Sequence, residues 1–308
     1  MTKYRILFLF IIFLNANNLL LYSQGCCSIS INSLGGIENV SPGKNSLILG
    51  ISYWHLNSSA YFVDNKKEND PLQRTARGNN IILDLEYGLS NLLSLYISIP
   101  YNFYYRKTKI NSTLNELNNS GLSDLLVLLK FKLFNNFWSN LNSFSLGAGG
   151  KFPTGGTASE KDGVELPLDL QLGSGSFDIY LWGLYYHFLS EQFLISQSFL
   201  YKYTSKNKNE YKFGPELNLQ TSFLYSFFEK MIYANIIVRI QKRWKDLSSN
   251  QVVVNSGRFL IELLPGFQFN YSGLNLRTNI GIPLYTLVGG KQLSILYRLG
   301  LEMRYSIF

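Results

Sequence analysis

Charged side chains alternate with apolar ones along several stretches of the 308-residue chain. In residues 80–88, for example, Asp84 and Glu86 interleave with Leu83 and Leu85. Successive side chains of a β-strand point to opposite faces, so each such stretch would have one polar and one apolar face. The polar-face residues that could pair with one another, or contact a polar solute in a lumen, are Asp84, Glu86, Asp124, Lys130, Lys132, Asp178, Glu216, Asn218, Gln220, Arg239, Glu262, Arg277, Arg298, Glu302 and Arg304.

Hairpin register predicts partners for some of these charges. A turn centred near residue 250 would bring Arg239 close to Glu262. A turn near residue 289 would bring Arg277 close to Glu302 by the same count. Opposite charges on neighbouring strands can pair, so these four side chains could be structural. The cations with no obvious single partner, which could attract anions, are Lys130, Arg298 and Arg304.

Enzyme chemistry has little support in the sequence. The only histidines are His55 and His187, and His55 has Ser59 nearby on its predicted apolar face. A hydrolase also needs a positioned base and a third group that orients it, and no motif supplies them. The stretch 147-GAGGKF-152 lacks the Ser or Thr that follows Lys in a phosphate-binding loop. We therefore expect no catalysis and no cofactor or metal.

The composition favours strands that are half apolar and half polar. Apolar residues make up 46% of the chain and charged residues 16%, against roughly 25% charged in soluble domains. Mean hydropathy is only +0.01, so the apolar residues are spread evenly rather than gathered into membrane helices. The expected strands are 46–62, 80–88, 92–106, 121–133, 142–152, 175–187, 193–204, 215–228, 232–243, 257–270, 274–286 and 292–307.

These strands predict an all-β fold, a transmembrane antiparallel β-barrel of about 12 strands. Long polar loops alternate with short turns, which is typical of bacterial outer-membrane barrels with long extracellular loops and short periplasmic turns. Most of these strands have at least the roughly 9–11 residues that cross the hydrocarbon layer. Rings at 101–105 and 199–203 lie near the long-loop ends, as an interfacial girdle would. The apolar face should therefore meet lipid, and the polar face should line a lumen.

The N-terminal region reads as an export signal. Lys3 and Arg5 precede the apolar run 6–14, which is too short to span a bilayer as a helix. The adjacent Cys26 and Cys27 cannot staple a fold, and Cys26 is either a lipidated residue or part of an ordinary exported N-terminus. The expected organisation is a signal peptide (1–23), a short periplasmic segment (24–45) and an outer-membrane barrel (46–308).

The C-terminal stretch 292–308 alternates from Leu293 and Ile295 on to Ile307, and the chain ends on Phe308. An amphipathic last strand with a terminal aromatic residue is similar to the signal that the outer-membrane assembly machinery reads. We expect that machinery to be a partner through this strand.

Four segments resemble a known family: 87-YGLSNLLSLYISIPY-101, 121-GLSDLLVLLKFKL-133, 150-GKFPTGG-156 and 166-LPLDLQLGSGSFD-178. They look like the outer-membrane β-barrel transporters grouped with the meta-pathway of phenol degradation (MetA-like proteins). The resemblance implies a passive transporter of small molecules and leaves the substrate open.

The resulting hypothesis is an outer-membrane channel that passes small molecules, with hydrophobic or aromatic compounds as candidates, through its lumen. The alternative is a closed structural or surface-interaction barrel without transport. The loop 153–173 either folds into the lumen as a constriction or stays outside. The loop 202–212 has four Lys against one Glu, which suits lipopolysaccharide phosphates, and we expect membrane lipid rather than nucleic acid as a partner.

Overall fold

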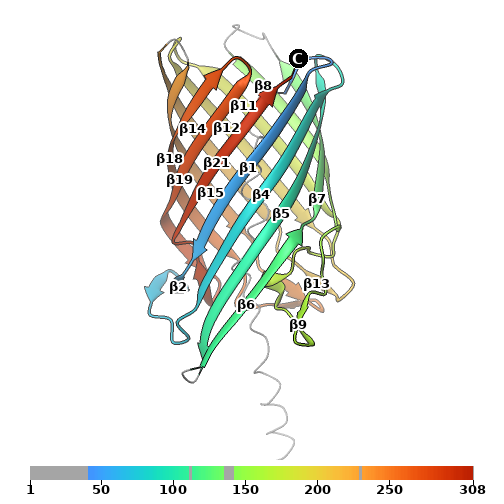
Figure 1. Ribbon diagram of the computed structural model, residues 1–308, viewed down its shortest axis with the longest axis vertical. Coiled ribbons are helices and arrows are strands. Elements are labelled where there is room, and N and C mark those ends of the chain that lie inside the picture. Colours follow the sequence, from blue (N-terminus) through green and yellow to red (C-terminus); the bar gives the residue numbers. More distant parts are fainter. Residues whose placement is uncertain (1–40, 111–112, 135–141, 229–230, 308) are drawn as a thin grey trace, which may run out of the picture.

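The computed structural model describes residues 41–110, 113–134, 142–228 and 231–307, and these form a closed antiparallel β-barrel (Figure 1). The described strands of its wall are β1 (Leu47–Ser58), β4 (Thr75–Gly88), β5 (Leu93–Ile110), β7 (Leu125–Phe134), β8 (Asn142–Phe152), β11 (Asp178–Phe188), β12 (Phe193–Thr204), β14 (Glu216–Phe227), β15 (Ile232–Arg243), β18 (Arg258–Tyr271), β19 (Leu274–Val288) and β21 (Tyr297–Ser306). The barrel closes because β1 pairs with both β4 and β21, and β4 also pairs with β5. The predicted all-β fold and number of strands are confirmed.

Closure explains how so many strands coexist without an exposed edge. Each wall strand pairs with a neighbour on both sides, so its backbone hydrogen bonds are satisfied within the sheet. The bounds of β8, β12 and β15 are those predicted from the alternation. The described residues include no helix long and apolar enough to cross a membrane.

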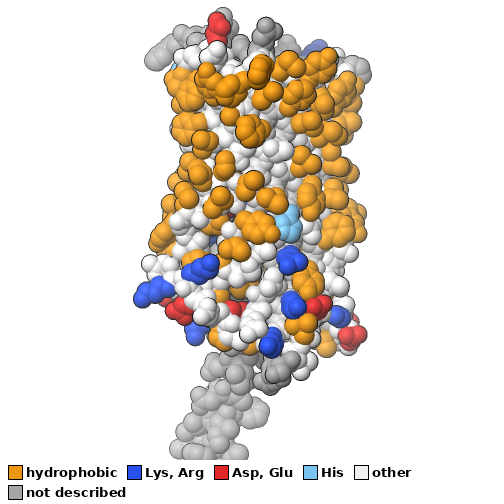
Figure 2. All heavy atoms as spheres, turned by 60° about the vertical axis from the view of Figure 1, so that its left-hand side comes forward, with side chains coloured by type: hydrophobic (Ala, Val, Ile, Leu, Met, Phe, Trp, Pro, Cys, Tyr) orange, Lys and Arg blue, Asp and Glu red, His pale blue; other side chains and the backbone are white. Residues whose placement is uncertain are grey.

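The outer surface of the barrel is apolar. Leu83, Ile236 and Leu301 each keep about half of their surface exposed, at 52%, 50% and 51%. Figure 2 shows such side chains covering the wall, with Lys, Arg, Asp and Glu gathered beyond it at the long-loop end. Contiguous apolar surface of this extent is unfavourable in water and favourable in lipid. The apolar face therefore points outward.

The long-loop end holds more regular structure than the sequence suggested. Residues 107–110 and 113–120, predicted as part of a loop, instead belong to the end of β5 and to its partner β6 (Thr113–Leu122), and these paired strands project beyond the barrel rim (Figure 1). Their exposed polar side chains lack the two-sided alternation by which strands were recognised, but their backbones still pair. The predicted loop 63–78 likewise contains β3 (Lys66–Glu68) and the first residues of β4.

The C-terminal strand is shorter than predicted. Residues 292–307 do not form one strand, because β20 (Lys291–Ser294) leaves the wall and pairs with β2 (Ala60–Val63) in a separate small sheet. Leu293 and Ile295, predicted to face lipid, are each only 2% exposed and pack in a cluster at the barrel mouth. The alternation runs through the break unchanged, so the pattern alone could not reveal it. The wall resumes at Tyr297 in β21.

Candidate functional site in the barrel interior

The predicted polar-face residues line the inner side of the wall. Lys132, Asn218 and Arg277 are half-buried, and the others are buried. Glu86, Lys130 and Glu262 have no measurable exposure. Buried charges are tolerated only where they are paired or hydrogen-bonded, so their partners define what the interior can do.

One buried cluster centres on Glu86 of β4. Lys130 Nζ lies 3.0 Å from Glu86 Oε1, and Arg304 Nη2 lies 3.5 Å from Glu86 Oε2. Lys130 also stands 4.7 Å from the centre of the Trp182 ring, a cation–π distance. Lys130 and Arg304, for which the sequence indicates no obvious single partner, therefore share Glu86 as a partner. Lys130 reaches Glu86 across the intervening strand β5, where the facing residue is the small Ser94.

A second buried pair joins strands that are not neighbours. Arg298 Nε lies 2.8 Å from Glu262 Oε1, although β19 separates β21 from β18. Gly281 faces Arg298 on β19, and a Cβ there would come within 2.3 Å of Arg298 Cγ. The absence of a side chain at Gly281 is therefore what lets Arg298 cross. Arg298, predicted to have no single partner, has this one.

In both predicted pairs the two residues stand opposite each other on neighbouring strands, but only one of the two pairs is an ion pair. Arg239 does stand opposite Glu262, yet its guanidinium donates to Gln220 Oε1, at 3.2 and 3.1 Å. Arg277 stands opposite Glu302, and Arg277 Nη1 lies 3.9 Å from Glu302 Oε2.

Two buried lysines were missed by the sequence reading. Lys151 Nζ bridges Asp124 Oδ2 at 2.6 Å and Asp178 Oδ2 at 3.0 Å. Lys202 Nζ lies 3.7 Å from Glu216 Oε2. Both fall on the polar phase of their strands, and Lys151 also belongs to the segment 150–156 that carries the family resemblance. Their position on the polar face of each strand was the sequence feature that could have identified these two lysines.

Part of the segment 153–174 packs at the long-loop end of the lumen. Its short 3-10 helix η3 (Leu168–Leu170) puts Leu170 in a buried apolar cluster with Leu56, Tyr104 and Leu260. Those three come from β1, β5 and β18, on different sides of the wall, so Leu170 occupies the mouth between them. The part of this loop around η3 therefore folds inward, whereas residues 160–165 stay exposed.

Asp169 of η3 is held against the wall by an ion pair. Arg106 Nη1 donates to both carboxylate oxygens of Asp169, at 3.0 and 2.9 Å. Burial raises the pKa of the Asp169 carboxyl above its ordinary value, and the Arg106 charge opposes that shift only in part. The docked loop therefore contains a carboxyl that favours its neutral form more than an exposed one does.

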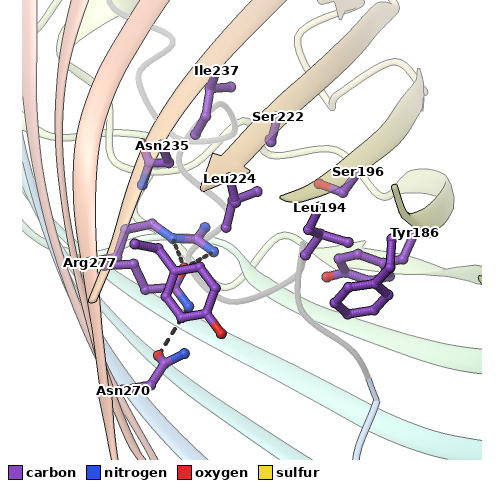
Figure 3. Close-up of a pocket in the computed structure, with 12 residues that line it drawn as sticks. Tyr186, Leu194, Ser196, Ser222, Leu224, Asn235, Ile237, Asn270 and Arg277 are labelled. Atoms are coloured by element: carbon purple, nitrogen blue, oxygen red, sulfur yellow. Dashed lines mark hydrogen bonds between the residues drawn. The ribbon is translucent and has the colours of Figure 1, made fainter. Parts of the chain in front are cut away.

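The opposite, short-turn end contains a cavity of about 200 Å³ (Figure 3). Rings and aliphatic side chains make up about half of its lining, and amides, hydroxyls and one guanidinium make up the rest. Its lining residues are Tyr186, Phe188, Leu194, Ser196, Ser222, Leu224, Tyr233, Asn235, Ile237, Gln268, Asn270 and Arg277. This mixture suits a small amphiphilic molecule.

The outward-facing His55 is not arranged as a catalytic base for Ser59. His55 Nδ1 lies 2.8 Å from Asn79 Oδ1, while Ser59 Oγ donates to Asn57 Oδ1 at 2.7 Å. Within the described ranges no group of three or more His, Cys, Asp and Glu side chains could hold a metal ion.

Solved structures share this fold. An outer membrane channel from Pseudomonas putida F1 matches with a TM-score of 0.70 and 16% identity, over 88% of this chain and 98% of that one. The transport unit of the autotransporter AIDA-I from Escherichia coli matches with a TM-score of 0.50 and 11% identity, over 92% and 95%. At such identities the similarity shows the fold alone. No curated protein sequence matches the chain.

The sequence itself matches a protein family. Residues 57–246, more than half of the chain, match the family described as “Putative MetA-pathway of phenol degradation”. The matched range contains the segments 87–101, 121–133, 150–156 and 166–178, on which the resemblance was noted. The chain therefore belongs to this family of outer-membrane-type β-barrels.

Proposed function

We propose that this protein is an outer-membrane channel through which small molecules pass passively along the barrel lumen. Residues 1–23 serve as the signal peptide, and the apolar wall lies in the outer membrane. The exposed Lys206 and Lys208 meet lipopolysaccharide phosphates, and the last strand is read by the assembly machinery. The buried polar residues of the wall line the path.

The observation that supports this proposal most directly is that the two ends of the lumen are lined differently. A cavity of about 200 Å³ occupies the short-turn end, whereas Leu170 and its partners occupy the long-loop end. A barrel with only a structural role has no need of an internal amphiphilic cavity. The segment 153–174 is then the constriction that limits the passage of solutes.

The experiment compares two serine substitutions within this loop in planar bilayers. Leu170→Ser removes the side chain at the centre of the apolar cluster and should raise single-channel conductance severalfold. Val164→Ser is the matched control, because Val164 lies in the same loop but is 68% exposed and contributes little to the docked state. The wild-type conductance should be small and discrete.

The alternative function, a closed structural or surface-interaction barrel, is favoured by one observation, the extent of charge pairing across the interior. Glu86, Glu262 and Glu216 all have cationic partners within 4 Å. Bilayers that stay silent with the wild-type protein and also with Leu170→Ser would support this alternative and contradict the channel.

A further inference from the structure

Three of the sequence segments that carry the family resemblance meet where the segment 153–174 leaves and re-enters the wall. These three segments are 121–133, 150–156 and 166–178. They supply Asp124, Lys151 and Asp178, which lie on or beside the neighbouring strands β7, β8 and β11. Lys151 stands directly opposite Asp178, and the loop between β8 and β11 begins two residues after Lys151. These charged side chains are therefore placed to hold the two ends of the loop.

Asp124 contacts both ends of the loop at once. Gly155 N, near the start of the loop, donates to Asp124 Oδ1 at 3.0 Å. Ser174 N and Ser174 Oγ, at its end, each donate to Asp124 Oδ2 at 2.9 Å. The Asp124 side chain is only 7% exposed, so water competes little for these hydrogen bonds. One carboxylate thus fixes the distance between the two ends of the loop.

Lys151 offsets the cost of burying the Asp124 charge, because its Nζ lies 2.6 Å from Asp124 Oδ2. The same Nζ donates to Ser174 Oγ and, at 3.3 Å, to Ser176 O, so it also contacts the returning end of the chain. Ser176 Oγ in turn donates to Asp178 Oδ1 at 2.9 Å. The carboxylate, the ammonium and the end of the loop therefore form one buried network.

Two glycines let the ends of the loop approach each other beside Asp124. A Cβ on Gly173 would lie 2.4 Å from Gly155 O and 2.7 Å from Asp124 Oδ1. A Cβ on Gly155 would lie 2.8 Å from Gly173 Cα. These distances are far below van der Waals contact, so any side chain at either position would push the two ends apart.

The directional contacts at Asp124 complement the apolar packing of Leu170. Hydrophobic packing is not directional, so it does not set the position of the loop by itself. Hydrogen bonds to a carboxylate are directional and are strengthened by the charge. The neighbouring Ser123 Oγ also donates to Leu172 O, two residues after the end of η3. The contacts at positions 123 and 124 thus lie close to the part of the loop that folds inward.

We propose that Asp124 is the positioning residue of the constriction: it holds both ends of the segment 153–174 so that η3 is presented to the lumen. The inference rests on the proposed channel function, in which this segment is the constriction. Without the carboxylate, a loop of this length gains many alternative conformations, and the contacts of η3 at the mouth become one arrangement among several.

Asp124→Asn tests the proposal because an amide has one acceptor oxygen where the carboxylate has two, and can serve only one end of the loop. Hydrogen exchange, followed by mass spectrometry on the purified protein in detergent, measures the result. Backbone amides of the segment 153–174 should exchange roughly tenfold faster or more, while those of β7, β8 and β11 keep the wild-type rate. Conductance in planar bilayers should rise severalfold.

Asp246→Asn is the matched control for the loss of a buried carboxylate. Asp246 has no measurable exposure and holds a different long loop, accepting from Gly214 N at 2.7 Å and Tyr211 Oη at 2.6 Å. Its replacement should leave both the exchange of the segment 153–174 and the conductance as in the wild type.

Gly173→Ala tests the same anchor without changing any charge. The added methyl group must displace Gly155 or Asp124, so exchange and conductance should change as in Asp124→Asn. Gly156→Ala is its control, because the nearest heavy atom to a Cβ there is Ser159 Oγ at 3.7 Å, an ordinary contact. If Asp124→Asn does not fold into a barrel, the comparison of these two alanine variants decides.

The two measurements separate this inference from the channel itself. Unchanged exchange in Asp124→Asn and Gly173→Ala would overturn the anchor and leave a conducting channel in place. Faster exchange with unchanged conductance, where the wild type conducts, would also overturn the positioning role. Faster exchange with bilayers that stay silent for every protein would leave the anchor standing and remove the channel.

Discussion

At the scale of single residues, the interior is governed by the cost of burying charge. Most buried carboxylates on the inner wall have a cation within 4 Å, often from beyond an intervening strand, and this pairing offsets the cost of burying their charge. Arg298 crosses β19 above Gly281, and Lys130 crosses β5 above Ser94. A small residue on the intervening strand is therefore as necessary as the two charged residues that pair across that strand.

The Arg298–Glu262 pair makes this dependence measurable. Arg298→Met should lower the free energy of unfolding by about 3 kcal/mol, because it leaves the Glu262 carboxylate buried without its cation. Urea unfolding in lipid vesicles is the measurement. Combining Arg298→Met with Glu262→Gln should restore part of the loss, since no buried charge then remains unpaired.

Lys206→Met is the control for that series. Lys206 Nζ lies 2.6 Å from Glu210 Oε2, but both side chains are exposed, so its loss should cost less than about 1 kcal/mol. Equal costs for Arg298→Met and Lys206→Met would contradict the assigned role of burial.

At the scale of elements, the segment 153–174 is the proposed constriction of the lumen. It docks through Leu170 in the apolar cluster and through the Arg106–Asp169 ion pair. Burial raises the pKa of Asp169, so the docked loop binds a proton more tightly than an undocked one. Docking therefore gains stability as pH falls through the raised pKa, and the gain is complete below the ordinary value of about 4.

We expect the wild-type conductance to fall as pH is lowered from neutral towards 4. Asp169→Asn is neutral at every pH, so its conductance should be low at neutral pH and nearly independent of pH. Planar-bilayer recordings across this range are the measurement. Asp162→Asn, an exposed position in the same loop, should keep the wild-type pH profile.

At the scale of the whole molecule, closure of the sheet is what makes a membrane location possible. The wall leaves no unpaired edge and turns its apolar side chains outward, and the long loops gather at one end (Figures 1 and 2). In such barrels the long-loop end faces the cell exterior and the short turns face the periplasm.

Cysteine labelling on intact cells checks this orientation. In a variant with Cys26 and Cys27 changed to Ser, Val164→Cys should react with a membrane-impermeant maleimide. Leu189→Cys is similarly exposed but lies in a short turn, and it should react only after the cells are broken. The reverse pattern would mean that the barrel is inserted the other way round.

The sequence by itself determined the alternation, the number of wall strands and the polar and apolar faces, because a period of two depends only on local backbone geometry. It also placed Arg239 opposite Glu262 and Arg277 opposite Glu302, because hairpin register follows from counting along the chain.

Only the tertiary structure decided which charges meet across an intervening strand. It also decided that Leu170 fills the mouth and that Leu293 and Ile295 leave the wall to pack there. These contacts join segments far apart in the sequence, and they depend on the curvature of the closed wall and on the space left by Gly281 and Ser94. A pattern of alternating residues contains no information about either.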